Sequence, residues 1–184
     1  MLNKALATDT LSCHLIQDII DWVQEKELEV LANTWIPIRR RNLRFKGFDR
    51  AVYRFGCCYM QRFVPDEAEI SLSKVLKVKD NADGIINVIA HEVLHGILPY
   101  DECHGNYFES GMYAVNEKLG IHILEKGIVG KYIKPKYKYE LYCPHCDKAL
   151  KKYLRKCDSI KHPSKYYCGK CHTTLISRKC KDVL

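Results

Sequence analysis

The chain has 184 residues, of which 47% are hydrophobic, and its 30 Lys plus Arg against 22 Asp plus Glu give a formal charge of +8. That hydrophobic content excludes wholesale disorder, and no apolar run approaches the roughly 18–20 residues that would span a bilayer. The N-terminus also lacks the basic start and the apolar core of a signal peptide, so we expect a cytoplasmic protein without a membrane partner.

Charge is distributed unevenly along the chain, which suggests two parts. Residues 131–184 hold 15 basic and four acidic side chains, whereas residues 1–130 hold 15 basic and 18 acidic ones. A stretch of roughly 130 residues can bury an ordinary core, but one of roughly 54 residues needs a metal or a disulfide to stay folded. We therefore predict a core-forming domain over residues 1–130 and a basic domain over residues 131–184, in a chain that is monomeric by default.

Three segments have apolar residues at the spacing of a helix, namely residues 9–33, 83–98 and 107–119. The acidic side of the first helix is expected to face solvent. The residues that would begin or end these helices are Thr8, Asp9 or Thr10, then Asp80, Asn81 or Asp83, and finally Pro99 and Gly120.

The region between the first two helices is basic and aromatic, and it is expected to form antiparallel strands over residues 51–63 and 69–78. It begins with a cluster of arginines, with aromatic residues interleaved further on. Two interpretations stay open: a nucleic-acid groove, or strands whose aromatic residues face the core and whose arginines face water. The candidate contacts of this cluster are Arg39, Arg40, Arg41 and Arg44.

A metal-binding motif lies inside the second predicted helix. His91, Glu92 and His95 form an HExxH sequence. Because residues i and i+4 project from one helix face, both imidazoles can bind one zinc ion while Glu92 lies beside it. There Glu92 would be the catalytic base, taking a proton from zinc-bound water and passing it to the leaving amine.

A catalytic zinc site needs a third protein ligand, and several side chains after the motif could supply it. His104 stands nine residues after His95, Asp101 stands six residues after it, and Glu109 and Glu117 lie on the next predicted helix. Imidazole is the commoner third ligand in a loop, and a flexible glycine follows His104. The residues therefore favour His104, with Asp101 as the next choice.

Four of the ten cysteines have the spacing of a second metal site: Cys143, Cys146, Cys168 and Cys171. Each CxxC pair forms a tight knuckle, and four thiolates aimed at one point close a tetrahedral structural zinc site. Such a metal supplies the folding free energy that the small basic domain lacks, so we predict a β zinc ribbon. The other six cysteines show no ligand pattern and are interpreted as plain or packed thiols.

The predicted ribbon is rich in lysine, with tyrosines among the cations. Phosphates attract cations and bases stack on aromatic rings, so this surface is a candidate for nucleic-acid contact. A solvated lysine-rich face is the alternative. The candidate contacts are Lys151, Lys152, Arg155 and Lys156.

Together these motifs resemble the SprT-like family of zinc metallopeptidases, which includes the Spartan-type DNA–protein crosslink proteases. The resemblance rests on residues 70–76, the HExxH motif, residues 104–108 and the cysteine pairs. It implies an α+β fold, in which a zincin-like domain with an N-terminal helix, a short antiparallel sheet, the HExxH helix and its partner precedes the ribbon. It also implies that His91, His95 and His104 bind the catalytic zinc and that Glu92 is the catalytic base.

The expected function is that of a zinc-dependent endopeptidase with one catalytic and one structural zinc ion. Its expected partners are a protein substrate and DNA, either single-stranded or carrying crosslinked protein. The alternative is a non-catalytic zinc-ribbon adaptor or regulator that binds DNA or a protein, and a peptidase without a nucleic-acid role is a third hypothesis. A Glu92→Gln substitution separates the catalytic hypotheses from the adaptor.

Overall fold

The computed structural model describes residues 12–78, 80–100, 102–126, 132–133 and 136–180. The chain divides into two compact units, Met1–Ile133 and Lys134–Leu184, a few residues beyond the change in charge. None of the helices in the described ranges combines the length and the apolarity that crossing a lipid bilayer would take.

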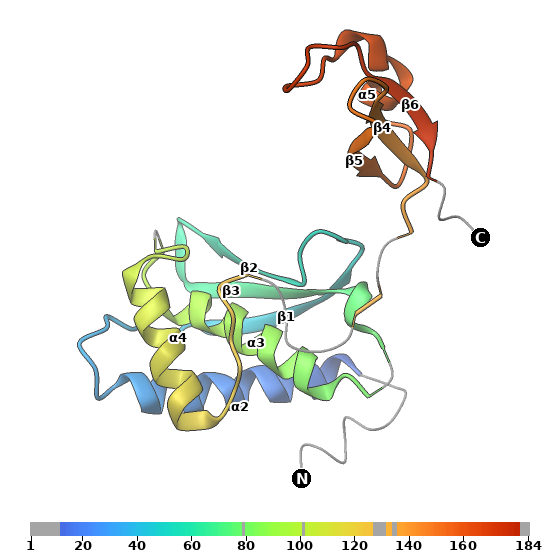
Figure 1. Ribbon diagram of the computed structural model, residues 1–184. Coiled ribbons are helices and arrows are strands. Elements are labelled where there is room, and N and C mark those ends of the chain that lie inside the picture. The colour runs from blue at the N-terminus through green and yellow to red at the C-terminus, as the bar shows by residue number, and fades with distance from the viewer. Residues whose placement is uncertain (1–11, 79, 101, 127–131, 134–135, 181–184) are drawn as a thin grey trace. The chain divides into compact units, whose positions relative to one another are not determined.

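A three-stranded mixed sheet is the base of the first unit (Figure 1). Its strands are β1 (Asn42–Asp49), β2 (Gly56–Gln61) and β3 (Val64–Ser73), in the order β1-β3-β2. β3 runs parallel to β1 and antiparallel to β2, and because it lies between them, β1 and β2 are the edges of the described sheet. Alternation along the strands buries Leu43, whereas Arg44 and Lys46 pair with glutamates of β3.

The sheet differs from the sequence-based expectation in two ways. Strands were expected over residues 51–63 and 69–78, and β2 and β3 do form an antiparallel pair there, but residues 42–49 add a parallel strand that the basic and aromatic composition concealed. The sheet is therefore mixed rather than antiparallel. Residues Lys74–Leu76 form a 3₁₀ turn instead of continuing the strand, because the Ser73 side chain caps that turn.

In the described part of the first unit, the helices α2 (Cys13–Leu31), α3 (Ala82–Ile97) and α4 (Asn106–Leu119) lie on one side of the sheet (Figure 1). The three predicted helices are confirmed, with small shifts at their ends. Ser12 caps α2 by accepting a hydrogen bond from the backbone of residue 15 at 3.2 Å. The expected caps Thr8, Asp9 and Thr10 lie outside the described residues. Gly120 ends α4 in the left-handed conformation, as expected.

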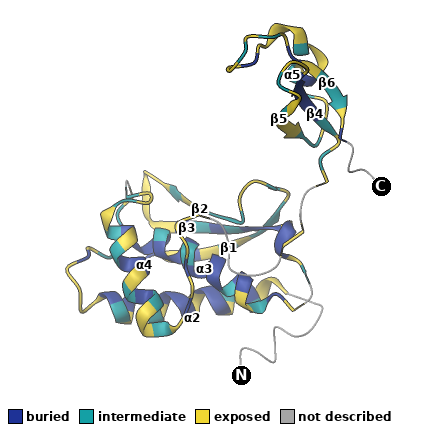
Figure 2. Cartoon of the chain, in the orientation of Figure 1, coloured by how far each residue is buried: buried dark blue, intermediate teal, exposed yellow. Residues whose placement is uncertain are grey.

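The hydrophobic core lies between the sheet and these helices, and α3 passes through its centre. Figure 2 shows α3 as mostly buried, with Ile89, Val93 and Leu94 fully so. A helix that is apolar on nearly all sides belongs inside a protein. The polar residues of its HExxH motif, His91, Glu92 and His95, line a surface cavity at the boundary of this core.

The second unit is a small antiparallel sheet with two metal-binding knuckles. Its strands are β4 (Tyr139–Cys143), β5 (Lys148–Tyr153) and β6 (Ile176–Lys179), in the order β5-β4-β6, and a short helix α5 (Asp158–Lys161) packs beside them. Its buried hydrophobic cluster is small, and it includes two of the paired cysteines. The protein is thus α+β, with a β-rich second unit.

Candidate functional site

Three imidazoles meet at α3 and the loop that precedes α4. His91 and His95 lie one turn apart on α3, and His104 comes from the loop. Their Nε2 atoms form a nearly equilateral triangle, with 3.2 Å between His91 and His95 and 3.1 Å from His104 to each of them. In a tetrahedral site, Zn–N bonds of about 2.0–2.1 Å place ligand nitrogens about 3.3 Å apart. The triangle therefore fits one face of a zinc coordination tetrahedron, while the alternative ligand Asp101 lies outside the described residues.

A backbone carbonyl from beyond α4 orients the first of these imidazoles. Nδ1 of His91 lies 2.9 Å from the carbonyl oxygen of Leu124, so Nδ1 donates and Nε2 keeps its lone pair for a metal. Asn87 and Asn116 hold the segment that carries this carbonyl, through hydrogen bonds of 2.8–2.9 Å to the backbone of residues 122–123. Sequence reasoning missed these asparagines, because no spacing rule connects them to the motif.

A fully buried phenylalanine forms the floor under the three imidazoles. The ring centroid of Phe108 lies 4.9, 4.4 and 4.7 Å from those of His91, His95 and His104. The carboxylate of Glu102 fixes the turn that carries Phe108, because its Oε1 accepts from the backbone N–H of Phe108 at 3.3 Å and of the preceding residue at 2.7 Å. This carboxylate caps α4 and so positions the third imidazole.

Burial also sets the protonation state of the two helical imidazoles. The pKa of His91 is lowered to about 4, mainly by burial and less by His104, against the raising effect of the Leu124 hydrogen bond. The pKa of His95 is lowered to about 3, mainly by burial and in addition by the two neighbouring imidazoles. Neutral imidazole is the form that binds a metal. The two side chains are therefore in the metal-binding form at neutral pH.

Glu92 lies beside this triangle, in a tight space between α3 and the edge strand β2. Its side chain is 6% exposed, and burial raises its pKa to about 7, against the opposing effects of a backbone hydrogen bond from Cys58 and of the Arg54 charge. A Cβ atom on Gly56 would lie 2.6 Å from Oε1 of Glu92 and 2.8 Å from Cγ1 of Val88. Only glycine lets β2 approach this closely, and a carboxyl with a pKa near 7 can both accept and release a proton at neutral pH.

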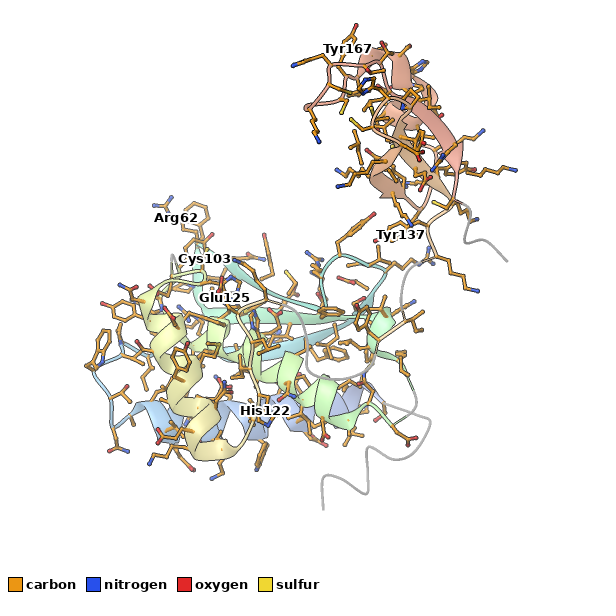
Figure 3. The ribbon with its side chains drawn as sticks, in the orientation of Figure 1. Arg62, Cys103, His122, Glu125, Tyr137 and Tyr167 are labelled. Carbon is orange, nitrogen blue, oxygen red and sulfur yellow. The ribbon has the colours of Figure 1, made fainter. Side chains whose placement is uncertain are left out.

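A cavity of about 860 Å³ opens over the imidazoles and Glu92. One wall is β2 with the loop before it, and the opposite side comes from the segments that flank α4. Figure 3 labels Cys103 before α4 and both His122 and Glu125 after it, and all three line the cavity. The edge strand, Glu92 and the imidazole triangle thus share one open space.

The second unit gathers its four paired cysteines at one point. The Sγ atom of Cys171 lies 3.4 Å from those of Cys143 and Cys146, and Cys146 lies 3.9 Å from Cys168. These separations are far longer than a disulfide bond of about 2.05 Å, and they agree with the roughly 3.8 Å edge of a tetrahedron with Zn–S bonds of about 2.3 Å. The cluster therefore fits a closed four-thiolate zinc site.

The arginine cluster before and within β1 is largely tied to the protein itself. Arg41 is 4% exposed and donates to the carbonyl oxygens of Pro65, Gly96 and Leu98 at 2.5–2.7 Å. Its predicted nucleic-acid contact is therefore wrong, because this guanidinium caps the C-terminal end of α3 instead. The exposed side chain of Arg40 forms a bidentate pair with Glu25.

The other predicted nucleic-acid contacts lie on the surface, and some of them also contact neighbouring side chains. Arg39 is exposed, and Arg44 pairs with Glu67 at 3.3 Å on the outer face of the sheet. In the second unit, Lys151 lies 5.7 Å from the ring centre of Tyr153, and Lys156 lies 5.8 Å from that of Tyr139. Lys152 is opposite Glu140 in the sheet register, and Arg155 is exposed.

Comparison with known protein families gives a match over most of the first unit. The model of the SprT-like family matches residues 16–127, which is more than half of the chain and contains most of α2, the sheet, α3, α4 and the imidazole triangle. No curated protein and no solved structure matches the chain.

Proposed function

The chain belongs to the SprT-like family, and from that premise we propose that its first unit is a zinc-dependent endopeptidase. One observation carries the proposal: three Nε2 atoms 3.1–3.2 Å apart share a cavity with a nearly buried glutamate. Zinc held by His91, His95 and His104 would supply a Lewis acid that activates water and polarises a carbonyl. The closed thiolate site of the ribbon offers no such open position.

Glu92 has the properties of a general base and acid in this scheme. Its pKa of about 7 lets it hold a proton taken from water and release it to the amine that leaves. Gly56 keeps the carboxylate in place, because any side chain there would occupy the position of Oε1. Burial on α3 excludes bulk water from one side of the carboxylate.

The open edge of β2 supports an extended polypeptide as the substrate. β2 pairs with β3 on one side only, and its residues from Gly56 to Met60 line the cavity. A peptide in extended conformation can add to such an edge by main-chain hydrogen bonds. Because the Cys58 backbone lies at hydrogen-bonding distance from Glu92, a peptide on this edge would pass beside the carboxylate.

Three variants test the enzymatic part of the proposal. Glu92→Gln keeps the shape of the side chain but removes the base, so we expect zinc content to remain at two ions per chain while cleavage of an unfolded protein falls at least about 100-fold. His104→Ala should reduce zinc to one ion per chain, and Asp101→Ala should leave two. Unchanged proteolysis in Glu92→Gln would overturn the endopeptidase, and zinc loss in Asp101→Ala alone would overturn the ligand set.

We also propose that the ribbon binds DNA and so brings the peptidase to protein on DNA. Lys151, Arg155 and Lys156 are exposed on it, and Tyr167 offers a ring that is 63% exposed. Binding of a fluorescent single-stranded oligonucleotide should weaken steeply with salt, and Lys151→Ala with Lys156→Ala should reduce the slope by about one to two ions. Lys26→Ala is the matched control, since Lys26 pairs with Glu29 at 2.6 Å on α2 of the first unit. Binding that is indifferent to salt and to the lysines would contradict the DNA role.

A further inference from the structure

We infer that the cavity selects extended polypeptide with aromatic or large apolar side chains next to the scissile bond. This inference rests on the proposed endopeptidase and adds a substrate class to it. It comes from two features of the cavity wall: a group of exposed tyrosines, and charges that are already paired.

Three tyrosines from three different segments are among the residues that line the cavity. Tyr53 in the loop before β2 is 74% exposed, Tyr59 on β2 is 55% exposed, and Tyr100 just after α3 is 47% exposed. Leu124, on the opposite wall, is 41% exposed. Tyrosine supplies a large contact area with few rotatable bonds, so it binds apolar groups at a small cost in entropy.

Apolar side chains continue from this rim into the base of the cavity. Phe55, Met60 and Val88 belong to the lining, and Val88 lies one turn before Glu92 on α3. The close approach of β2 at Gly56 sets this base directly beside the carboxylate. A side chain that enters here would therefore be next to the bond that reacts.

Charge in the described part of the lining is balanced by near neighbours. Apart from Glu92, the formally charged lining residues there are Arg54, Glu125 and Lys126. Arg54 pairs with Asp49 at 2.9 Å, and Lys126 pairs with Glu125 at 2.9 Å. Apart from Glu92 itself, the described lining therefore offers no unpaired charge to attract an acidic or a basic side chain, so selection depends on apolar contact.

The experiment compares labelled decapeptides that are identical except at the two central residues, which are Phe-Leu, Ser-Gly, Lys-Lys or Glu-Glu. Zinc-loaded protein should cleave the Phe-Leu peptide at least about tenfold faster than the others. Tyr100→Ala and Tyr53→Ala should raise KM for Phe-Leu about fivefold and change Ser-Gly little, whereas the Phe variants keep the preference. Tyr113→Ala is the control, since Tyr113 is 63% exposed on α4 and does not line the cavity.

A second readout separates this inference from the endopeptidase itself. Fluorescence anisotropy of the same peptides with zinc-loaded Glu92→Gln protein measures binding without turnover. Tighter binding of Phe-Leu supports the inference even if no peptide is cleaved, and absence of Glu92-dependent cleavage would then overturn only the endopeptidase. Equal binding of all four peptides, or a preference for Lys-Lys or Glu-Glu, overturns the inference whether or not cleavage occurs.

Discussion

The two candidate metal centres belong to units that are stabilised in different ways. The imidazole triangle lies on the surface of a core that joins three helices and a sheet, with Ile89, Leu94 and Phe108 fully buried around it. The thiolate cluster is itself part of the buried cluster of the ribbon, where Cys143 and Cys168 stand beside Leu141, Ile160 and Leu175. The first unit should thus fold before it binds a metal, whereas the ribbon should fold by binding one.

Loss of a ribbon thiolate is the strongest test of this difference. Cys143→Ser should unfold the second unit, because structural zinc contributes about 10 kcal/mol or more in small metal-binding domains. The first unit should keep its fold and its own zinc. Proton NMR would show loss of the ribbon signals alone, and metal analysis would give one zinc per chain.

His145→Ala is the matched control, since His145 is exposed next to the knuckle and does not belong to the thiolate cluster. It should leave both units folded. Unfolding of the first unit in Cys143→Ser would show that the two units depend on each other for stability.

The core of the first unit also contains an unpaired buried carboxyl. Glu27 on α2 is fully buried, neither of its oxygens has a hydrogen-bond partner, and burial raises its pKa well above the usual 4.5. The folded state therefore binds a proton that the unfolded state releases, so stability is lost as pH rises from about 4.5 through the raised pKa. The hydrophobic core of the first unit, which does not depend on metal, is stable enough to tolerate the destabilisation from this buried carboxyl.

Glu27→Met should raise the free energy of unfolding by about 1–3 kcal/mol, because an apolar side chain of similar length replaces an unpaired polar one. The gain over wild type should grow as pH increases from about 5 to about 8. Melting temperatures of both proteins across this range measure it, and their difference cancels the opposite contribution of the buried histidines. A gain that shrinks with pH would show that Glu27 is ionised in the folded protein.

The close approach at the edge strand gives a prediction that affects activity more than folding. Gly56→Ala would place a methyl group 2.6 Å from Oε1 of Glu92. Relief of such overlap costs about 1–3 kcal/mol and displaces the carboxylate, so we expect a lower kcat with two zinc ions retained. Gly169→Ala, with no atom within 4 Å of the added Cβ, should change neither quantity. Full activity in Gly56→Ala would mean that β2 moves away from Glu92 without consequence.

The site residues that follow spacing rules were predictable from the sequence. The i, i+4 relation on a helix and the CxxC knuckle connect residues that are near one another in the chain, so His91, His95 and the cysteine pairs come together as their spacing requires. His104 required a choice among neighbours. The three helices were predictable for the same local reason.

Features that depend on distant contacts were not predictable. The basic character of residues 39–44 indicated a surface, yet Arg41 is buried because three carbonyl oxygens from β3 and the end of α3 satisfy its guanidinium. Likewise, β1 pairs in parallel with a strand that follows two turns later, and Asn116 positions the candidate ligand His91 only through the backbone of another segment. Such contacts have no periodicity that a single sequence reveals.

The two CxxC knuckles of the second unit are followed by different residues, and replacing each of these residues with glycine should give the smallest of the predicted effects. Each CxxC is followed by a residue in the left-handed region, Asp147 at φ 49° and His172 at φ 57°, where glycine is favoured by about 1 kcal/mol. Asp147 also accepts a hydrogen bond from the hydroxyl of Tyr142, whereas the side chain of His172 is exposed. His172→Gly should therefore raise the chelator concentration that removes half of the structural zinc, by up to about fivefold, and Asp147→Gly should not, because the lost hydrogen bond offsets the relief of strain. Equal gains in both variants would show that backbone conformation alone limits zinc retention.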